Sequence, residues 1–184
     1  SLEMIRIIYY AAVSVDGFIA RTGGDISGFV NSGSGVDKYL QDLSLYETVI
    51  MGRSTYEFGY EYGLKPGQPA YEHMDHYIFS KSLTFDKQHP KVNIISAYDL
   101  AEIDKIKAQA KTDIYLCGGG VFAGWLLDHG YIDNLKLKCN ALIIGEGAPL
   151  FAEAKQQYKL ELLESESFDK GLIINTYQVN YDKP

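Results

Sequence analysis

Apolar residues along the chain occur in short runs, and these alternate with segments that have the spacing of helices. The first run, residues 4–14, is nearly continuous, which is typical of a strand buried on both faces of a sheet. Five later apolar runs are also interpreted as strands. They are residues 47–52, 75–82, 91–96, 112–120 and 133–145.

Four segments between these runs are predicted to be helices. The clearest is residues 97–110, where apolar side chains recur at three- and four-residue intervals and share one face. Ser54 and Glu57 stand three residues apart at the start of another helix, which is a capping-box pattern. The remaining three helices are residues 36–46, 53–63 and 121–130.

The last two apolar segments, residues 159–168 and 172–181, are joined by an Asp-Lys-Gly sequence at 169–171 that signals a hairpin turn. Helical crossovers between the earlier strands require those strands to run parallel. We therefore predict an α/β fold with a single domain over residues 4–184. It has a mostly parallel central sheet of about eight strands, helices on both faces and an antiparallel C-terminal hairpin. Residues 1–3 are interpreted as a cloning remnant.

Charge and composition narrow the classes of function. The net charge is −7 with both signs scattered, which argues against nucleic-acid binding because a nucleic-acid groove needs a basic face. No apolar run approaches the ~20 residues that span a bilayer, and no signal-peptide pattern precedes the first strand. We therefore expect a cytoplasmic protein with neither a membrane nor a nucleic acid as partner.

Cysteine and histidine show no metal-ligand spacing, so we expect no metal site. Cys117 and Cys139 lie in separate apolar runs and are interpreted as buried free thiols. Tyrosine is unusually common, with 15 copies. A tyrosine-rich surface is typical of a ligand site or a subunit interface, so a homodimer is one expectation.

Three strand ends carry residues that suit an anionic ligand, and ligands of open parallel sheets bind at the carboxyl ends of the strands. Segment 51–57 (MGRSTYE) places glycine, arginine and two hydroxyl groups at a helix start, where free N–H groups attract anions. Segment 78–82 (IFSKS) adds a hydroxyl and an ammonium group, and segment 116–122 (LCGGGVF) adds three glycines. Each segment also has a purely structural interpretation, as a capped turn, a solvated strand exit or a tight glycine turn.

Five segments follow one another along the chain: AAVSVDGFIA, VIMGRSTYE, YIFSKS, IYLCGGGVF and LIIGEGAPLF. In this order they resemble the dihydrofolate reductase superfamily and its sister group, the reductase domain of riboflavin biosynthesis (the RibD C-terminal domain). The resemblance runs from about Met4 to Tyr181, and it implies a dihydrofolate reductase-like fold. It is specific for the superfamily but not for a substrate.

The resemblance implies NADPH as the hydride donor and a cis peptide between Gly118 and Gly119. The residues that would flank the nicotinamide are Ala11, Ala12, Ile19 and Ala20. Those that would hold phosphate are Gly52, Arg53, Ser54 and Thr55, with Arg53 and Lys81 selecting the 2′-phosphate and Ser80 beside the adenosine. Those that would cradle the diphosphate are Gly118, Gly119, Gly120, Val121 and Phe122.

The residues expected at the substrate site differ from those of both enzyme groups. Asp37 approximately matches the acidic residue that binds the pterin in folate reductases, and it is our candidate catalytic residue, as substrate anchor or proton donor. A buried carboxyl with a raised pKa can supply such a proton. The alternative is a carboxylate that only suits a helix start. The riboflavin-pathway reductases carry a lysine in the first strand, at a position that is Tyr10 in this chain.

The resulting hypothesis is an NADPH-dependent oxidoreductase that transfers hydride to a planar nitrogen heterocycle of the pterin or aminopyrimidine type. One alternative is the riboflavin-pathway enzyme that reduces 5-amino-6-(5-phosphoribosylamino)uracil. Another is a protein that binds and senses NADPH without catalysis. An ordinary Rossmann dehydrogenase is disfavoured because its glycine fingerprint is missing after the first strand.

Overall fold

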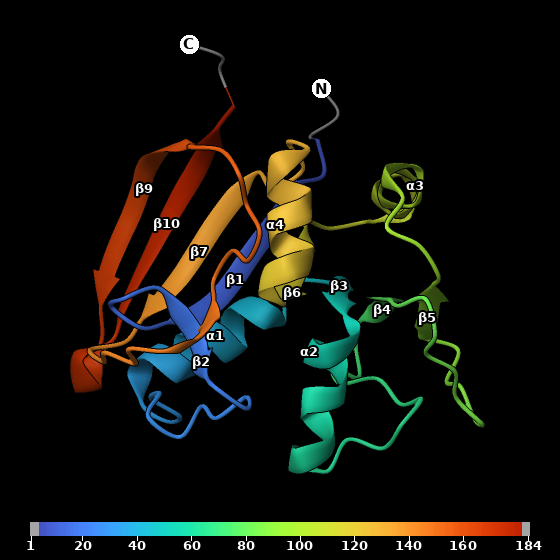
Figure 1. Ribbon diagram of the computed structural model, residues 1–184, viewed down its shortest axis with the longest axis horizontal. Helices are drawn as coiled ribbons and strands as arrows, with labels where there is room; N and C mark the ends of the chain where they lie inside the picture. The colour runs from blue at the N-terminus through green and yellow to red at the C-terminus, as the bar shows by residue number, and fades with distance from the viewer. Residues whose placement is uncertain (1–3, 182–184) are drawn as a thin grey trace.

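The computed structural model describes residues 4–181 (Figure 1), and the expected cloning remnant at residues 1–3 lies outside them. Its centre is an eight-stranded sheet with the order β5-β4-β3-β6-β1-β7-β10-β9. The strands of this sheet are β1 (Ile7–Val13), β3 (Thr48–Gly52), β4 (Asp75–Phe79), β5 (Val92–Ile95), β6 (Ile114–Gly118), β7 (Asn134–Cys139), β9 (Lys159–Ser167) and β10 (Ile173–Asn180).

Six of these strands run parallel, because every pairing among β5, β4, β3, β6, β1 and β7 is parallel. β10 pairs antiparallel with β7 on one side and with β9 on the other. The predicted α/β fold with its antiparallel terminal hairpin is confirmed. The central strands β1, β3 and β6 are short and almost continuously apolar, since both of their faces are covered.

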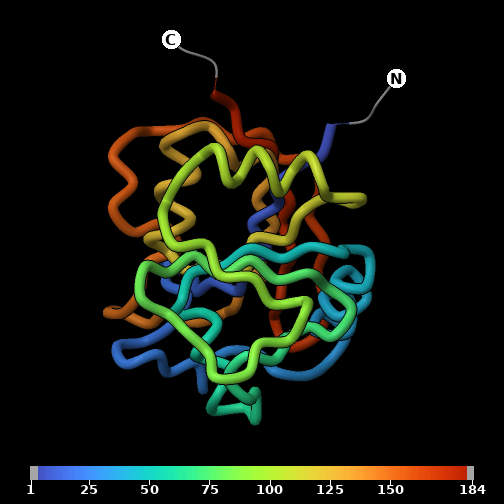
Figure 2. The backbone as a smooth tube through the Cα atoms, turned by 90° about the vertical axis from the view of Figure 1, so that its right-hand side faces the viewer, coloured from blue at the N-terminus to red at the C-terminus, as the bar shows by residue number. Residues whose placement is uncertain are grey.

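Helices cover both faces of the sheet, as predicted (Figure 1). One apolar core joins α3 and α4 to the face that carries Ile7 and Tyr9, and the other joins α1 and α2 to the face that carries Ile8 and Tyr10. Figure 2, turned to face the β5 end of the sheet, shows the green segment from β4 through α3 closing that side. The helices are α1 (Ser34–Leu43), α2 (Arg53–Phe58), α3 (Leu100–Gln109) and α4 (Gly120–Asp128).

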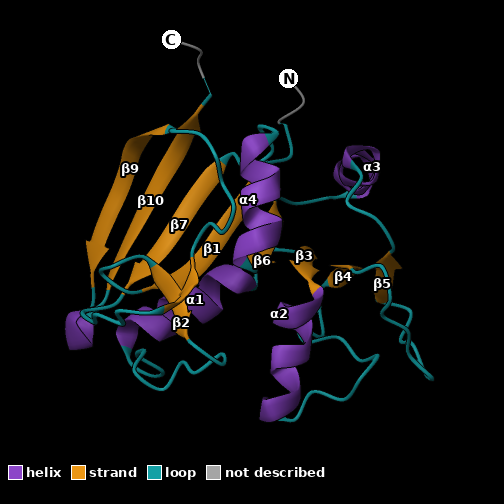
Figure 3. Cartoon of the chain, viewed as in Figure 1, coloured by secondary structure: helices purple, strands orange, loops and turns teal. Residues whose placement is uncertain are grey.

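Two short strands were not predicted. β2 (Phe18–Arg21) and β8 (Gly147–Pro149) pair antiparallel in a small second sheet, with Ala20 opposite Ala148. The sequence pattern assigned no strand or helix to either segment. The pair holds the loop after β1 against the loop after β7 at the carboxyl edge of the main sheet (Figure 3).

The start of α2 differs from the predicted capping box. The helix begins at Arg53, its N-cap is Gly52, and no side chain caps it. Glu57 instead accepts a hydrogen bond from Arg53 Nε at 3.0 Å. The capping-box prediction was wrong because the helix starts one residue before the serine that the pattern placed at its cap.

The N-terminus of α1 is capped from the other end of the chain. Its N-cap residue is Gly33, which offers no side chain. Asp169 Oδ1, in the hairpin turn between β9 and β10, accepts a hydrogen bond from the Ser34 amide at 2.9 Å. Ser34 Oγ accepts in turn from the Asp169 amide at 3.1 Å. The terminal hairpin therefore positions α1 as well as closing the sheet.

Among residues 4–181, no helix combines the length and the apolar character needed to cross a bilayer. Within the same residues, no three His, Cys, Asp or Glu side chains gather in a group that could hold a metal ion.

Candidate functional site

The carboxyl ends of β4, β3, β6, β1 and β7 lie next to one another at one edge of the sheet, the lower edge in Figure 1. Each of the three segments singled out in the sequence begins at one of these ends. MGRSTYE follows β3, IFSKS follows β4, and LCGGGVF joins β6 to α4. The fold therefore gathers the sequence-predicted cofactor residues at a single edge.

The glycine-rich turn after β6 contains the cis peptide that the family resemblance implied, between Gly118 and Gly119. Gly118 has φ of +133°, which side chains rarely adopt. A Cβ on Gly119 would lie 3.3 Å from Thr55 Oγ1 in the first turn of α2. The turn after β6 and the helix after β3 thus meet at these two glycines.

Gly120, the third glycine of the turn, allows close packing of the backbone. A Cβ on Gly120 would collide with the carbonyl oxygen of Pro149, and the Ala152 amide donates to the Gly120 carbonyl at 3.0 Å. Gly120 therefore lets the chain after β8 lie directly on α4, and in this structure its missing side chain does not open space for a ligand. Its neighbour Val121 is an apolar side chain that remains 48% exposed in the first turn of α4.

Arg53 connects the two segments that were expected to bind phosphate. Its Nη1 donates to Ser82 Oγ at 2.8 Å, so the guanidinium reaches from α2 to the turn after β4. Ser80 Oγ accepts from the Leu83 amide at 3.1 Å and thereby holds that turn. Ser54 and Lys81 are exposed beside them. The basic side chains of Arg53 and Lys81 and the exposed hydroxyl of Ser54 therefore lie at the same edge of the sheet.

The residues expected near the nicotinamide come from β1 and β2. Ala11 is buried towards α4, whereas Ala12 points to the α1 face and stays partly exposed. Ile19 and Ala20 lie in β2, both partly exposed. Asp16 fixes this region, because its carboxylate accepts from the Ile144 and Gly145 amides at 3.0 and 2.7 Å.

Asp16 lies in the sequence Ser-Val-Asp-Gly at residues 14–17, and Gly17 has the positive φ typical of a turn. Its carboxylate joins two loops that are far apart in the sequence, and it also accepts from Ser14 Oγ at 2.7 Å. Hydrogen bonds from Ser14 and from the Ile144 and Gly145 amides lower the pKa of Asp16 to about 2. The carboxylate is therefore held in its charged form as a structural acceptor.

Asp37 lies in the first turn of α1, but its side chain is exposed. The face of α1 that packs on the sheet carries Tyr39 and Asp42, and a residue two positions from Tyr39 points away from that face. Asp37 is therefore not a buried carboxyl. Its role in catalysis stays a prediction.

Several tyrosines that were not among the predicted site residues lie near the carboxyl edge, on the face of the sheet that α1 covers. Tyr39 Oη and Tyr115 Oη are 2.6 Å apart, and Tyr71 Oη lies 3.7 Å from Cys117 Sγ. Lys138 Nζ lies 3.4 Å from the centroid of the Tyr39 ring. We call Tyr39, Tyr71, Tyr115, Cys117 and Lys138 the tyrosine cluster.

Next to the tyrosine cluster, towards the amino ends of the strands, Asp42 is a buried carboxylate with three partners. It accepts from Tyr10 Oη at 2.8 Å and pairs with Lys38 and Lys136, each at 3.0 Å. Burial alone would raise the pKa of Asp42, but hydrogen bonds from Lys38, Lys136 and Tyr10 hold it below its ordinary value. Tyr10, which occupies the position of the riboflavin-pathway lysine, therefore has its hydroxyl bonded to Asp42.

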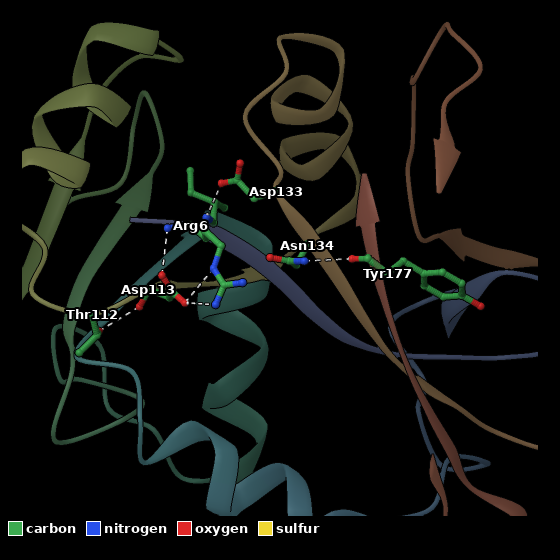
Figure 4. Close-up of polar contacts among 7 residues, drawn as sticks. Arg6, Thr112, Asp113, Asp133, Asn134 and Tyr177 are labelled. Carbon is green, nitrogen blue, oxygen red and sulfur yellow. Dashed lines mark hydrogen bonds and ion pairs between the residues drawn. The ribbon is translucent and has the colours of Figure 1, made fainter. Parts of the chain in front are cut away.

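A cavity of about 410 Å³ lies at the opposite, amino edge of the sheet, and Arg6, Tyr46, Asp113, Asn134 and Lys136 are among its lining residues. Figure 4 shows the polar contacts there, including the bond from Arg6 Nη2 to Asp113 Oδ2 at 2.9 Å. Lys136 is likewise paired, with Asp42. We place the candidate site at the carboxyl edge instead, because the three segments singled out in the sequence meet there.

The sequence model of the RibD C-terminal domain matches residues 6–174, which is most of the chain. The chain belongs to this family. YyaP of Bacillus subtilis (strain 168), described as an uncharacterized protein, is 26% identical to this RibD C-terminal domain over 189 residues, covering 98% of each chain.

Two solved structures share the fold of this RibD C-terminal domain. A Shewanella sp. PV-4 protein named for riboflavin biosynthesis has a TM-score of 0.81 at 22% identity, covering 96% of this chain and 99% of its own. Dihydrofolate reductase from Enterococcus faecalis, solved with NADP(H) and RAB-propyl, has a TM-score of 0.67 at 17% identity, covering 95% and 96%. The resemblance to the dihydrofolate reductase superfamily is therefore confirmed at the level of fold.

Proposed function

We propose that this RibD C-terminal domain is a reductase that uses NADPH to reduce a planar nitrogen heterocycle of the pyrimidine or pterin type. The observation that carries the proposal is the gathering of Arg53, Lys81 and the Gly118–Gly119 turn at one sheet edge, in a member of this family. The related fold in Enterococcus faecalis dihydrofolate reductase was solved with NADP(H), which supports the same cofactor.

The residues at this edge fit a dinucleotide. Gly52, Gly118 and Gly119 present backbone without side chains, and a Cβ on Gly119 would crowd Thr55 Oγ1 at 3.3 Å. The first amides of α4 lack helical acceptors and so are donors for a diphosphate. Val121 is exposed in that turn and would lie against a ligand bound there.

In this proposal each side chain has a stated task. Arg53 and Lys81 would bind the 2′-phosphate, and Ser54 and Thr55 would donate hydroxyl hydrogen bonds to phosphate oxygens. Ala12, Ile19 and Ala20 would form the apolar surface beside the nicotinamide. When bound, NADPH supplies the hydride, and the protein contributes position and electrostatics.

Replacing Arg53 by methionine tests the phosphate assignment. A charge-assisted hydrogen bond is worth about 1.5–3 kcal/mol, so R53M should bind NADPH about 10- to 100-fold more weakly and NADH with little change. Quenching of Trp125, the single tryptophan in the chain, reports binding because it lies one helical turn from Val121. Lys105→Met, on the exposed side of α3, is the matched control.

Equal losses of affinity for NADPH and NADH in R53M would contradict the role of Arg53 in selecting the 2′-phosphate.

The reductase assignment is tested by NADPH oxidation with dihydrofolate, dihydropterins and aminopyrimidines in turn. Turnover of one of these supports the proposal. Tight NADPH binding with no turnover across the whole panel would favour a protein that senses NADPH.

A further inference from the structure

Lys138 stands at the carboxyl edge beside the residue expected to flank the nicotinamide. It lies in β7 directly opposite Ala12 of β1, and the two side chains project from the same face of the sheet. Both residues remain partly exposed, as do Tyr39, Tyr71 and Cys117. The tyrosine cluster and Ala12 therefore form an accessible surface rather than sealed core.

The ammonium of Lys138 has no carboxylate partner among residues 4–181. Its Nζ lies over the face of Tyr39, 3.4 Å from the ring centroid. The carboxylate in the same register row belongs to Glu166 of β9, and Ile174 of β10 separates it from Lys138. Taking a charge out of water is costly unless it is paired, so this position calls for an explanation.

Lys136 provides the comparison within the same strand. It precedes Lys138 by two residues, projects from the same face, and its side chain is 18% exposed. Lys136 nevertheless pairs with Asp42 at 3.0 Å, and Asp42 is already shared with Lys38 and Tyr10. The chain thus pairs the first cation of β7 with a carboxylate and leaves the second over an aromatic ring.

The neighbours of Lys138 cannot neutralise it. Burial raises the pKa of Cys117, and burial raises the pKa of Tyr39 to about 12, so both groups stay neutral at neutral pH. Their hydrogen bonds are made to other members of the cluster. Because the ammonium occupies this face of Tyr39, a planar ring would lie against Ala12, with an acceptor atom within reach of Lys138 Nζ.

We propose that Lys138 is the group that selects the substrate, by donating a hydrogen bond to a carbonyl oxygen or an anionic nitrogen of a pyrimidine or pterin ring, and that it supplies the proton of the reduction. The inference rests on the proposed reductase function. Lys138, in β7, thereby takes the role of substrate anchor and proton donor that the sequence had suggested for Asp37. The site would favour acceptor-rich or anionic rings and disfavour protonated diaminopyrimidines, which need a carboxylate.

The proposed step balances atoms and charge. Reduction of a C=N bond adds a hydride, supplied by the reduced nicotinamide, to the carbon and a proton to the nitrogen. The N–H bond of the Lys138 ammonium breaks as the new N–H bond forms, leaving a neutral amine that regains a proton from water. Burial lowers the pKa of Lys138 to about 8, which brings this amine within the range suited to proton transfer.

Two probes of opposite charge test the selection directly, with or without NADPH. Barbiturate is a pyrimidine anion at neutral pH, and 2,4-diaminopyrimidine binds as a cation where a carboxylate is available. By calorimetry, the wild-type protein should bind barbiturate at least tenfold more tightly than 2,4-diaminopyrimidine. Lys138→Met should lose that preference, and Lys138→Arg should keep it.

The matched control is Lys107→Met, which removes a lysine of α3 placed over Tyr131, 5.8 Å from its ring centroid and away from the carboxyl edge. It should bind barbiturate like the wild type. NADPH affinity, followed by Trp125 fluorescence, should be the same in all four proteins, which shows that the variants fold. A preference of the wild type for the diaminopyrimidine, no binding of either probe, or an unchanged preference in K138M would each overturn the inference.

The pH dependence separates a charged hydrogen-bond donor from a merely structural lysine. With a pKa of about 8, the protonated fraction of Lys138 falls about tenfold between pH 7 and pH 9, and barbiturate affinity should fall with it. The affinity of K138R should stay flat over that range, since arginine keeps its charge. A flat profile in the wild type would overturn the role of Lys138. Absent NADPH binding in the wild type would instead count against the proposed function.

Discussion

At the scale of single residues, His76 shows how a buried polar group is satisfied in one protonation state only. The side chain is fully buried in β4. Its Nδ1 is 2.9 Å from the Met74 carbonyl oxygen, and its Nε2 accepts from the Tyr71 amide at 3.1 Å. A proton on Nε2 would remove that acceptor. Burial accordingly lowers the pKa of His76 to about 4.

This predicts a loss of stability in mild acid. Unfolded histidine has a pKa of about 6.5, so the unfolded chain binds more protons than the folded chain between about pH 6.5 and pH 4. The free energy of unfolding should therefore fall by about 2 kcal/mol between pH 7 and pH 5. Urea denaturation at the two pH values measures it.

His76→Gln is the informative variant, because glutamine does not titrate. It should be less stable at pH 7 but should lose most of the dependence on pH. His129→Gln, at the exposed C-terminus of α4, should leave the wild-type dependence intact. An identical pH dependence in H76Q and the wild type would show that other groups control acid stability.

Some of the candidate site residues were visible in the sequence and others were not. Gly118, Gly119, Arg53 and Thr55 were predicted because each lies in a compact segment whose own residues carry the signal. Lys138 gave no such signal, since an alternating Leu-Lys-Leu-Lys strand is the normal pattern of a half-exposed strand. Its significance depends on the missing carboxylate beside it, and that is a property of the packed sheet.

At the scale of elements, α1 depends on a residue in another element for its cap. Asp169 stands where a helix dipole favours a negative charge, and its carboxylate accepts the Ser34 amide. Asp169→Ala should destabilise the protein by about 1 kcal/mol in urea denaturation, the usual value for a lost N-cap. Circular dichroism should also show fraying of α1.

The control for this prediction is Glu161→Ala, an exposed residue on β9 in the same hairpin. It should change stability by less than about 0.5 kcal/mol. Equal effects of the two substitutions would mean that the loss of a surface charge, and not of the cap, explains D169A.

Elements were predictable where the local pattern was strong. The six parallel strands and four helices were found because each has a continuous apolar run or an apolar stripe of its own. β2 and β8 have neither, because they are short and exist through their pairing with each other. The cap of α1 was hidden for the same reason, since its two partners are separated by 135 residues.

At the scale of the whole molecule, cofactor binding should appear as global stability. A ligand present at 100 times its Kd adds about 2.7 kcal/mol to the free energy of unfolding. For a domain of this size NADPH should then raise Tm by about 5–10 °C. NADH at the same concentration should raise it less, because it lacks the 2′-phosphate that Arg53 is proposed to bind. Equal thermal shifts would contradict that preference.

The terminal hairpin has a consequence for the way the protein is made. β9 and β10 leave the ribosome after every other strand of the sheet, yet β10 covers the outer edge of β7, and the turn between them caps α1. A nascent chain halted before residue 159 exposes an unpaired strand edge, which is a template for aggregation. Lys138 lies on that edge, so the candidate site should be completed only after synthesis has passed the hairpin.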